Sequence, residues 1–153
     1  MSYEIRRAGH LDLPALESFE QGIIAYERRF DETLRPDPIS YYDITELVES
    51  QDAEVVVAEH EGAVVGSGYA KRTASLSYSF PNDHAFLGMM FVLPEHRGKG
   101  INGQILGALL DWAKRHELTE IRLTVYPGNE SALNAYLKAG FVPHLLEMRM
   151  NQS

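Results

Sequence analysis

The stretch Arg97-Gly98-Lys99-Gly100-Ile101-Asn102-Gly103 decides the fold, because it joins an apolar segment to a strongly amphipathic one. Residues 85–92 are apolar and precede Pro94, which cannot donate to a strand ladder, so they are predicted to form a strand that ends there. The following segment places apolar residues at helical spacing, at Ile101, Ile105, Leu109 and Trp112. Such a glycine-rich turn lets main-chain N–H groups and the positive end of a helix dipole approach an anion.

The glycines alone do not identify a ligand. No Gly-Lys-Ser/Thr follows at the spacing of a P-loop, and the G-x-G-x-x-G pattern of dinucleotide-binding folds is absent. A glycine-rich turn that binds nothing remains an equal alternative at this point. Arg97 and Lys99 would add mobile positive charge to a phosphate site formed by Arg97, Gly98, Lys99, Gly100, Ile101, Asn102 and Gly103.

A second motif runs from Asn129 to Phe141, after an extended stretch at 121–126 and the breaker Pro127-Gly128. It is similar to the N-x-x-A-x-x-x-Y-x-K-x-G-F element of the GNAT superfamily of N-acetyltransferases. Residues 92–101 resemble the acetyl-coenzyme A signature of the same family. The resemblance covers at least residues 54–142, and it is specific because two separated motifs agree in order and in their flanking elements.

The resemblance implies a mixed α/β fold, with a mostly antiparallel splayed sheet flanked by about four helices, and a single domain over residues 1–153. It implies direct transfer of the acetyl group of acetyl-CoA to a primary amine of a small molecule or protein. The alternative is a non-catalytic acyl-CoA-binding or sensing domain. One departure is Asn102, where the family usually has Gly or Ala. Because Asn tolerates tight turns, we expect the site to be kept.

Several residue roles follow from the resemblance. Tyr136 would lie near the thioester sulfur, where a phenol of pKa about 10 can protonate a thiolate whose conjugate acid has a pKa near about 8.5. Backbone groups of Phe91 and Val92, with those of Met90, would bind the pantetheine arm, and one amide there would polarise the thioester carbonyl. Asn129 would bind the pantetheine or phosphate portion, although a helix N-cap is an equal alternative.

The sequence does not identify the general base. Many family members carry an acidic residue on the strand before the phosphate loop, whereas this chain has Gly88 and Met89 there. The candidates are Glu27, which is our catalytic prediction, His84, and a water chain. Residues 26–43 are predicted to wall the acceptor cleft through Tyr26, Glu27, Phe30 and Tyr41, or else to form an ordinary charged surface loop.

The composition of the chain limits the classes of binding partner. The 153 residues are 44% hydrophobic, enough for the core of one domain, and a formal charge of -8 argues against nucleic-acid binding. The chain has no cysteine and no long apolar run, so we expect a cytoplasmic protein without a membrane contact. No metal-ligand spacing occurs among the six histidines, so no metal is expected. A homodimer is left open.

The predicted elements alternate between strands and helices. Asp12 is expected to cap the first helix, and Gly66-Ser67-Gly68 is expected to form a bulge or a point of close approach inside a strand. Strands are predicted at 3–7, 54–60, 63–70, 85–92, 120–126 and 141–150, and helices from 13 to 26 and at 39–50, 100–116 and 129–139.

Overall fold

The computed structural model describes residues 2–153, which divide into two compact units between Leu123 and Thr124. The first unit contains β1 (Glu4–Arg7), α1 (Leu13–Glu27), α2 (Ile44–Glu49), β2 (Ala53–His60), β3 (Ala63–Ala74), β4 (Asp83–Val92), α3 (Ile101–Arg115) and β5 (Ile121–Arg122). Two short 3-10 turns lie at His10–Asp12 and Pro94–His96. The second unit contains α4 (Glu130–Ala139).

The sheet has the order β1-β2-β3-β4-β5, and every neighbouring pair is antiparallel except β4 and β5. The parallel pair is short, because Ala85 is opposite Ile121 and Phe86 is opposite Arg122, and the β5 strand then ends. From Leu87 to Val92, β4 therefore continues without β5 beside it. This arrangement confirms the predicted mixed fold with a mostly antiparallel, splayed sheet.

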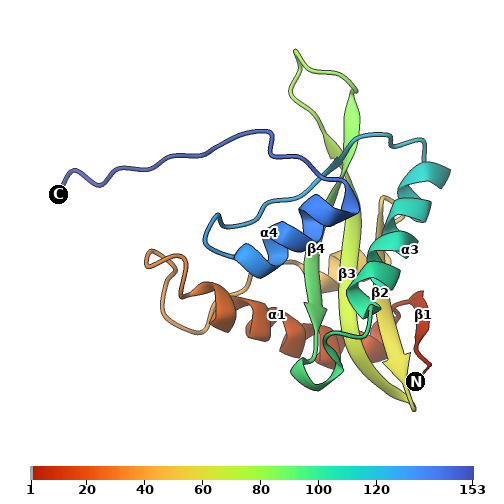
Figure 1. The fold of residues 1–153 in the computed structure, drawn as a ribbon. Coiled ribbons are helices and arrows are strands. Elements are labelled where there is room, and N and C mark those ends of the chain that lie inside the picture. The colour runs from red at the N-terminus through yellow and green to blue at the C-terminus, as the bar shows by residue number, and fades with distance from the viewer. Residues whose placement is uncertain (1) are drawn as a thin grey trace. The chain divides into compact units, whose positions relative to one another are not determined.

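Helices α1 and α3 cover opposite faces of the sheet (Figure 1). A Cβ on Gly22 of α1 would lie 3.0 Å from the Phe91 ring on β4. A Cβ on Gly68 of β3 would lie 2.8 Å from Ile105 of α3, so the helix rests directly on the strand backbone. Both helices thus need glycine at the contact.

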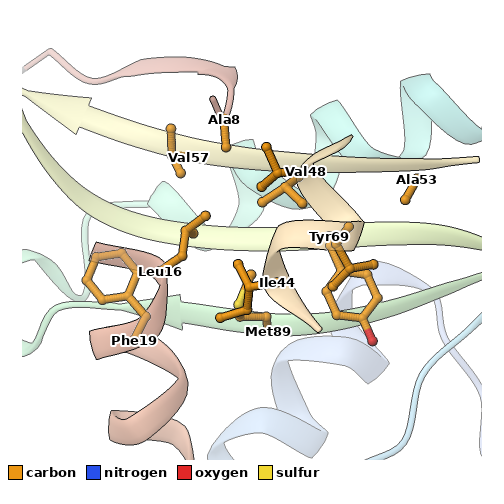
Figure 2. Packing of buried hydrophobic residues seen from close by; sticks show 11 residues of the cluster. Ala8, Leu16, Phe19, Ile44, Val48, Ala53, Val57, Tyr69 and Met89 are labelled. Carbon is orange, nitrogen blue, oxygen red and sulfur yellow. The ribbon is translucent and has the colours of Figure 1, made fainter. Parts of the chain in front are cut away.

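An apolar cluster lies on the face of the sheet that α1 and α2 cover (Figure 2). Burying each large side chain of this kind contributes about 1.5–3 kcal/mol relative to leaving it exposed. The cluster includes one phenol, Tyr69, among aliphatic and aromatic side chains: Ala8, Leu16, Phe19, Ile44, Leu47, Val48, Ala53, Val55, Val57, Tyr69 and Met89.

The predicted helix at 39–50 is shorter in the structure and begins at Ile44. The side chain of Asp43 accepts a hydrogen bond from the Glu46 N–H at 3.1 Å, which starts the helix at that point. Asp12 is not the side-chain cap that the sequence predicted for α1. Its carboxylate instead accepts hydrogen bonds from Arg6 and from the Gly9 N–H, each at 2.8 Å.

The predictions for the last two strands differ most from the structure. The strand predicted at 120–126 is limited to Ile121–Arg122, and the segment 141–150 forms no strand. Its large aliphatic side chains are exposed, and those of Leu145 and Met148 are each 83% exposed. An apolar alternation becomes a strand only where a neighbouring strand accepts its backbone hydrogen bonds, and the second unit has none.

Candidate active site

The glycine-rich loop takes a conformation that requires glycine at two positions. Gly98 has φ +76° and Gly100 has φ +80°, and other L-residues are strained in this left-handed region. Gly100 is the N-cap of α3 and supplies no capping side chain. The first hydrogen bond of the helix runs from the Gln104 N–H to the Gly100 carbonyl at 3.1 Å, so the amides before it lie outside the helical ladder.

The space in front of this helix start is open. A Cβ on Gly98, Gly100 or Gly103 would meet no heavy atom within 4 Å among the residues that the structure describes. The N–H groups of Ile101, Asn102 and Gly103 and the positive end of the helix dipole face this part of the loop. The residues present therefore fit a phosphate group without rearrangement of the backbone.

Arg97 is anchored, where the sequence predicted a mobile charge. Its Nε donates to the Val92 carbonyl at 2.9 Å, and its guanidinium carbon lies 5.7 Å from the centre of the Phe91 ring. The side chain thus ties the loop to the end of β4. Lys99 is exposed between the two left-handed glycines.

Strand β4 contains a bulge opposite Gly68. Ser67 is opposite Phe91 while Tyr69 is opposite Gly88, so β4 has one extra residue between the two pairs. Met89, in this bulge, has φ +53°. The Gly66-Ser67-Gly68 stretch is therefore a point of close approach, at Gly68, and the bulge itself lies opposite it on β4.

The buried Ser67 hydroxyl holds the bulge. It donates to the Met89 carbonyl at 2.8 Å. Because the C=O and N–H of a trans peptide point in opposite directions, the Met90 N–H of the same peptide points away from Ser67. A single hydroxyl on β3 thus orients an amide on β4.

The side chain of Phe91 packs against other residues of the protein, so only its backbone groups are available to a ligand. Its ring stacks on Phe19 of α1, with ring centres 5.0 Å apart. Met90 points to the opposite face, where its sulfur lies 2.6 Å from the place of a Cβ on Gly68. The backbone between them lies on the stretch of β4 that β5 does not cover.

Glu27 ends α1 and is half-buried. Burial raises the pKa of its carboxyl, the nearby Tyr41 hydroxyl opposes that rise, and the neighbouring Asp31 charge adds to it. Tyr26 and Phe30 pack edge to face beside it, with ring centres 5.6 Å apart. The structure therefore brings the four predicted acceptor residues to one end of α1.

Tyr42 connects this group to the β4 bulge. Its hydroxyl is hydrogen-bonded to the Met89 backbone, and its ring meets Tyr69 edge to face at 5.5 Å. Burial raises the pKa of the Tyr42 phenol, as do the neighbouring Tyr69, Glu27 and Glu20 groups, while the Met89 backbone bond opposes the rise.

Glu20 fixes the position of the two tyrosines. One oxygen of its carboxylate accepts hydrogen bonds from the Tyr41 and Tyr42 N–H groups, both at 2.8 Å, and the side chain is 3% exposed. The sequence predicted no role for Glu20 or Tyr69, and it included Tyr42 and Ser67 only as members of the 26–43 segment and of the Gly66-Ser67-Gly68 stretch. Glu20 could have been noticed, because a carboxylate within the apolar stripe of a helix needs a buried partner.

His84 does not join the acceptor residues. It lies near the start of β4, and at about 3.3 Å per residue it is about 20 Å from Met90. Its Nδ1 is 3.0 Å from the Ser75 hydroxyl, and burial, with Arg122 nearby, lowers its pKa. A base must lie within hydrogen-bond reach of the proton it removes, so this position disfavours His84.

The second unit holds the other two predicted residues on α4. Asn129 is the N-cap, and its Oδ1 accepts from the Ala132 N–H at 3.4 Å, which establishes the capping role. Tyr136 is half-buried and packs edge to face on Phe141, with ring centres 5.6 Å apart. The helix ends at Gly140, whose φ is +109°.

An open groove of about 600 Å³ lies along the outer part of α1 and the turn into α2. Its lining contains three carboxylates and neither lysine nor arginine. The lining residues are Glu17, Glu20, Gln21, Ser40, Tyr41, Tyr42, Asp43, Ile44 and Thr45. Across residues 2–153, no group of three or more His, Asp or Glu side chains is arranged to hold a metal ion. None of the helices formed by these residues has the length and apolar character needed to cross a membrane.

The chain belongs to the acetyltransferase (GNAT) family, whose model matches residues 20–141. It is 35% identical over 71 residues to the uncharacterised N-acetyltransferase YobR of Bacillus subtilis (strain 168), which is 46% of this chain and 29% of that protein. It is 31% identical over 101 residues to the mycothiol acetyltransferase of Acidimicrobium ferrooxidans, which is 64% of this chain and 31% of that protein. The chain thus spans less than a third of the length of these curated relatives.

The fold is also found in a crystal structure of a predicted acetyltransferase with acetyl-CoA from Clostridium acetobutylicum. The TM-score is 0.75 and the sequence identity is 18%, over 98% of this chain and 96% of the other. At that identity the similarity establishes the shared fold.

Proposed function

We propose that the chain acts as a single N-acetyltransferase domain that moves the acetyl group of acetyl-CoA to a primary amine by direct attack. The observation that carries this proposal is the start of α3, where Gly100 leaves the first amides uncapped in open space directly after β4. Family membership and the names of the relatives support the same reaction. The alternative of an acyl-CoA-binding domain without turnover shares this loop but gives no purpose to the half-buried carboxylate of Glu27.

For the cosubstrate, the pyrophosphate would bind the loop from Arg97 to Gly103. Its N–H donors would be Ile101, Asn102 and Gly103, with Lys99 and Arg97 supplying charge. The pantetheine arm would pair with the backbone of Phe91 and Val92 along the part of β4 that β5 leaves open. Asn129 would add its side-chain amide from α4 while its oxygen keeps the cap.

The transfer needs three groups. The Met90 N–H, oriented by Ser67, would stabilise the oxyanion that forms on the thioester carbonyl. The amine nitrogen forms the new bond to the carbonyl carbon, and the C–S bond breaks with its electron pair on sulfur. Tyr136 would protonate the departing thiolate, and the nitrogen loses one proton as the amide forms.

The acceptor would enter beside the end of α1. Ionised Glu27 would attract a cationic amine or accept its proton, and the aromatic rings of Tyr26, Phe30 and Tyr41 would surround its apolar part. The formal charge of -8 of the protein also favours a cationic substrate.

The test is thiol release from acetyl-CoA in the presence of ethanolamine, tyramine, spermidine and glycinamide, with identification of the acetylated amine by mass spectrometry. We expect at least one amine to be turned over above the hydrolysis background. Binding of CoA without acetylation of any amine in a wider panel would favour the sensing domain.

Tyr136→Phe then tests the acid. We expect kcat to fall by about 10²-fold while CoA affinity stays unchanged, because only the hydroxyl at the leaving group is lost. Tyr78→Phe is the matched control, since Tyr78 is 83% exposed on the β3–β4 connection. An unchanged kcat with a limiting chemical step would assign Tyr136 to packing alone.

A further inference from the structure

Gly88 on β4 is covered by the phenol of Tyr69. A Cβ on Gly88 would lie 2.5 Å from Cε2, Cζ and Oη of Tyr69, a distance at which no side chain fits. Gly88 is also one of the two positions where the family resemblance leads one to expect an acidic residue. The ring from β3 therefore occupies the space that a side chain at position 88 would need.

The Tyr69 hydroxyl lies beside Tyr42, whose own hydroxyl bonds the Met89 backbone. Tyr69 is 7% exposed, yet among residues 2–153 its oxygen has no hydrogen-bond partner. In Figure 2 this oxygen lies at the edge of the cluster and points away from Leu16 and Phe19.

The ring of Tyr69 is buried, but its hydroxyl oxygen is not among the fully buried, unpartnered side-chain oxygens of residues 2–153, so the hydroxyl still reaches solvent. A phenylalanine at position 69 would fill the same apolar space. The hydroxyl thus bonds none of the described residues and is available to a ligand. It lies at the place of a side chain on Gly88, one residue from the β4 bulge.

The protonation state of Tyr69 limits what its hydroxyl can do. Burial raises the pKa of the phenol above its ordinary value of about 10, so it stays neutral at physiological pH. A neutral phenol does not remove a proton from an amine, but its oxygen can accept a hydrogen bond from an amine N–H.

We propose that the Tyr69 hydroxyl binds the acceptor amine at the β4 bulge and replaces the missing acidic residue of that strand as the group that orients the nitrogen. This inference rests on the proposed acetyl transfer. The amine enters neutral, with one N–H donated to Tyr69 Oη and its lone pair directed at the acetyl carbon. The nitrogen forms the N–C bond, sulfur leaves with the C–S electron pair, and the net proton passes from nitrogen to the thiolate.

The experiment compares Tyr69→Phe with the wild type, using whichever of ethanolamine, tyramine, spermidine and glycinamide has the highest kcat/KM. We expect kcat/KM for the amine to fall about tenfold, the scale of one hydrogen bond. The acetyl-CoA KM and the melting temperature should stay unchanged, because the hydroxyl has no partner in the fold. Tyr42→Phe is the matched comparison and should lower the melting temperature, since it loses the bond to Met89.

Gly88→Ala gives an independent measurement, because its methyl would displace the Tyr69 ring. In the folded protein it should lower kcat/KM for the same amine at least as far as Tyr69→Phe does. Wild-type kinetics of Tyr69→Phe, or a fall in its melting temperature that matches Tyr42→Phe, would overturn the inference. A wild-type protein that acetylates no amine would overturn the proposed function itself, which is a separate outcome.

Discussion

The proposed phosphate loop and the proposed acceptor side are built in different ways. The loop depends on consecutive residues and on backbone: Gly98 and Gly100 take positive φ, and the amides at the start of α3 stay uncapped. The acceptor side depends on side chains from distant positions, since Glu27, Tyr42 and Tyr69 come from a helix, a loop and a strand. A backbone site tolerates most side-chain changes except at its glycines, whereas a side-chain site is sensitive at each contributing residue.

The largest expected effect tests the backbone side of this comparison. Gly100→Val should lower CoA affinity by at least about 100-fold, equal to about 2.8 kcal/mol. The branched side chain enters the open space of the loop, and φ +80° adds strain of about 1–2 kcal/mol without a clash inside the protein. Calorimetric titration with CoA measures the loss.

Gly107→Ala is the matched control, because it adds a methyl to open space in the same helix and has no positive φ. It should keep wild-type CoA affinity. Equal affinity of folded Gly100→Val and wild type would remove the loop from the binding site.

The second effect tests whether a side chain orients the β4 amide. Ser67→Ala leaves the Met89 carbonyl without its donor, which costs about 1–3 kcal/mol of stability. We expect kcat to fall about tenfold, with the acetyl-CoA KM within about twofold, because the Met90 N–H loses its orientation.

Thr73→Ala is the control for this prediction. The Thr73 hydroxyl also donates to a backbone carbonyl, that of Lys71 at 3.2 Å, but this bond lies at the exposed end of β3. It should preserve kcat. A Ser67→Ala enzyme that is less stable but has full kcat would show that Ser67 serves the fold alone.

The third prediction concerns charge on the acceptor side. Glu27→Gln should raise KM for a cationic amine about fivefold or lower kcat, and leave the acetyl-CoA KM unchanged, because the amide keeps the shape and removes the charge. Exposed Glu32→Gln in the same loop is the control. Parallel changes in both variants would point to a general surface potential.

The pH dependence of Glu27 has a defined sign. Burial raises its pKa above 4.5, so the folded protein binds this proton more tightly than the unfolded chain does. Its contribution to stability is present below pH 4.5 and is lost as pH rises through the folded pKa. The melting temperature of Glu27→Gln minus that of wild type should therefore increase over this window, while wild-type kcat/KM for the cationic amine falls on acidification.

The smallest effect is expected at Asn129. Aspartate caps a helix as well as asparagine does, so Asn129→Asp should keep the melting temperature. It removes the side-chain N–H₂ that we propose binds CoA and replaces it with a negative charge, so CoA affinity should fall about threefold. Unchanged affinity, measured in the same titration as Gly100→Val, would assign Asn129 to capping only.

Local signals in the sequence predicted most of the fold. The apolar period around Ile105 and the glycines before it were enough to place α3 and its N-terminus. The signal failed at 141–150, where strand-like alternation found no partner strand, and at 39–43, where Asp43 delays the helix until Ile44. Strand pairing depends on distant backbone, which a local pattern does not contain.

The sequence by itself determined the glycine-rich loop, which we propose binds phosphate, together with the family and the residues at one end of α1, because each is carried by neighbouring residues or by regular spacing. Only the tertiary structure decided that Ser67 holds the β4 bulge, that Glu20 binds the amides of the two adjacent tyrosines, and that the Tyr69 ring fills the space over Gly88. These contacts join residues about 20 apart in the chain. They form because sheet register and helix packing bring such residues together, and that information is spread over the whole core.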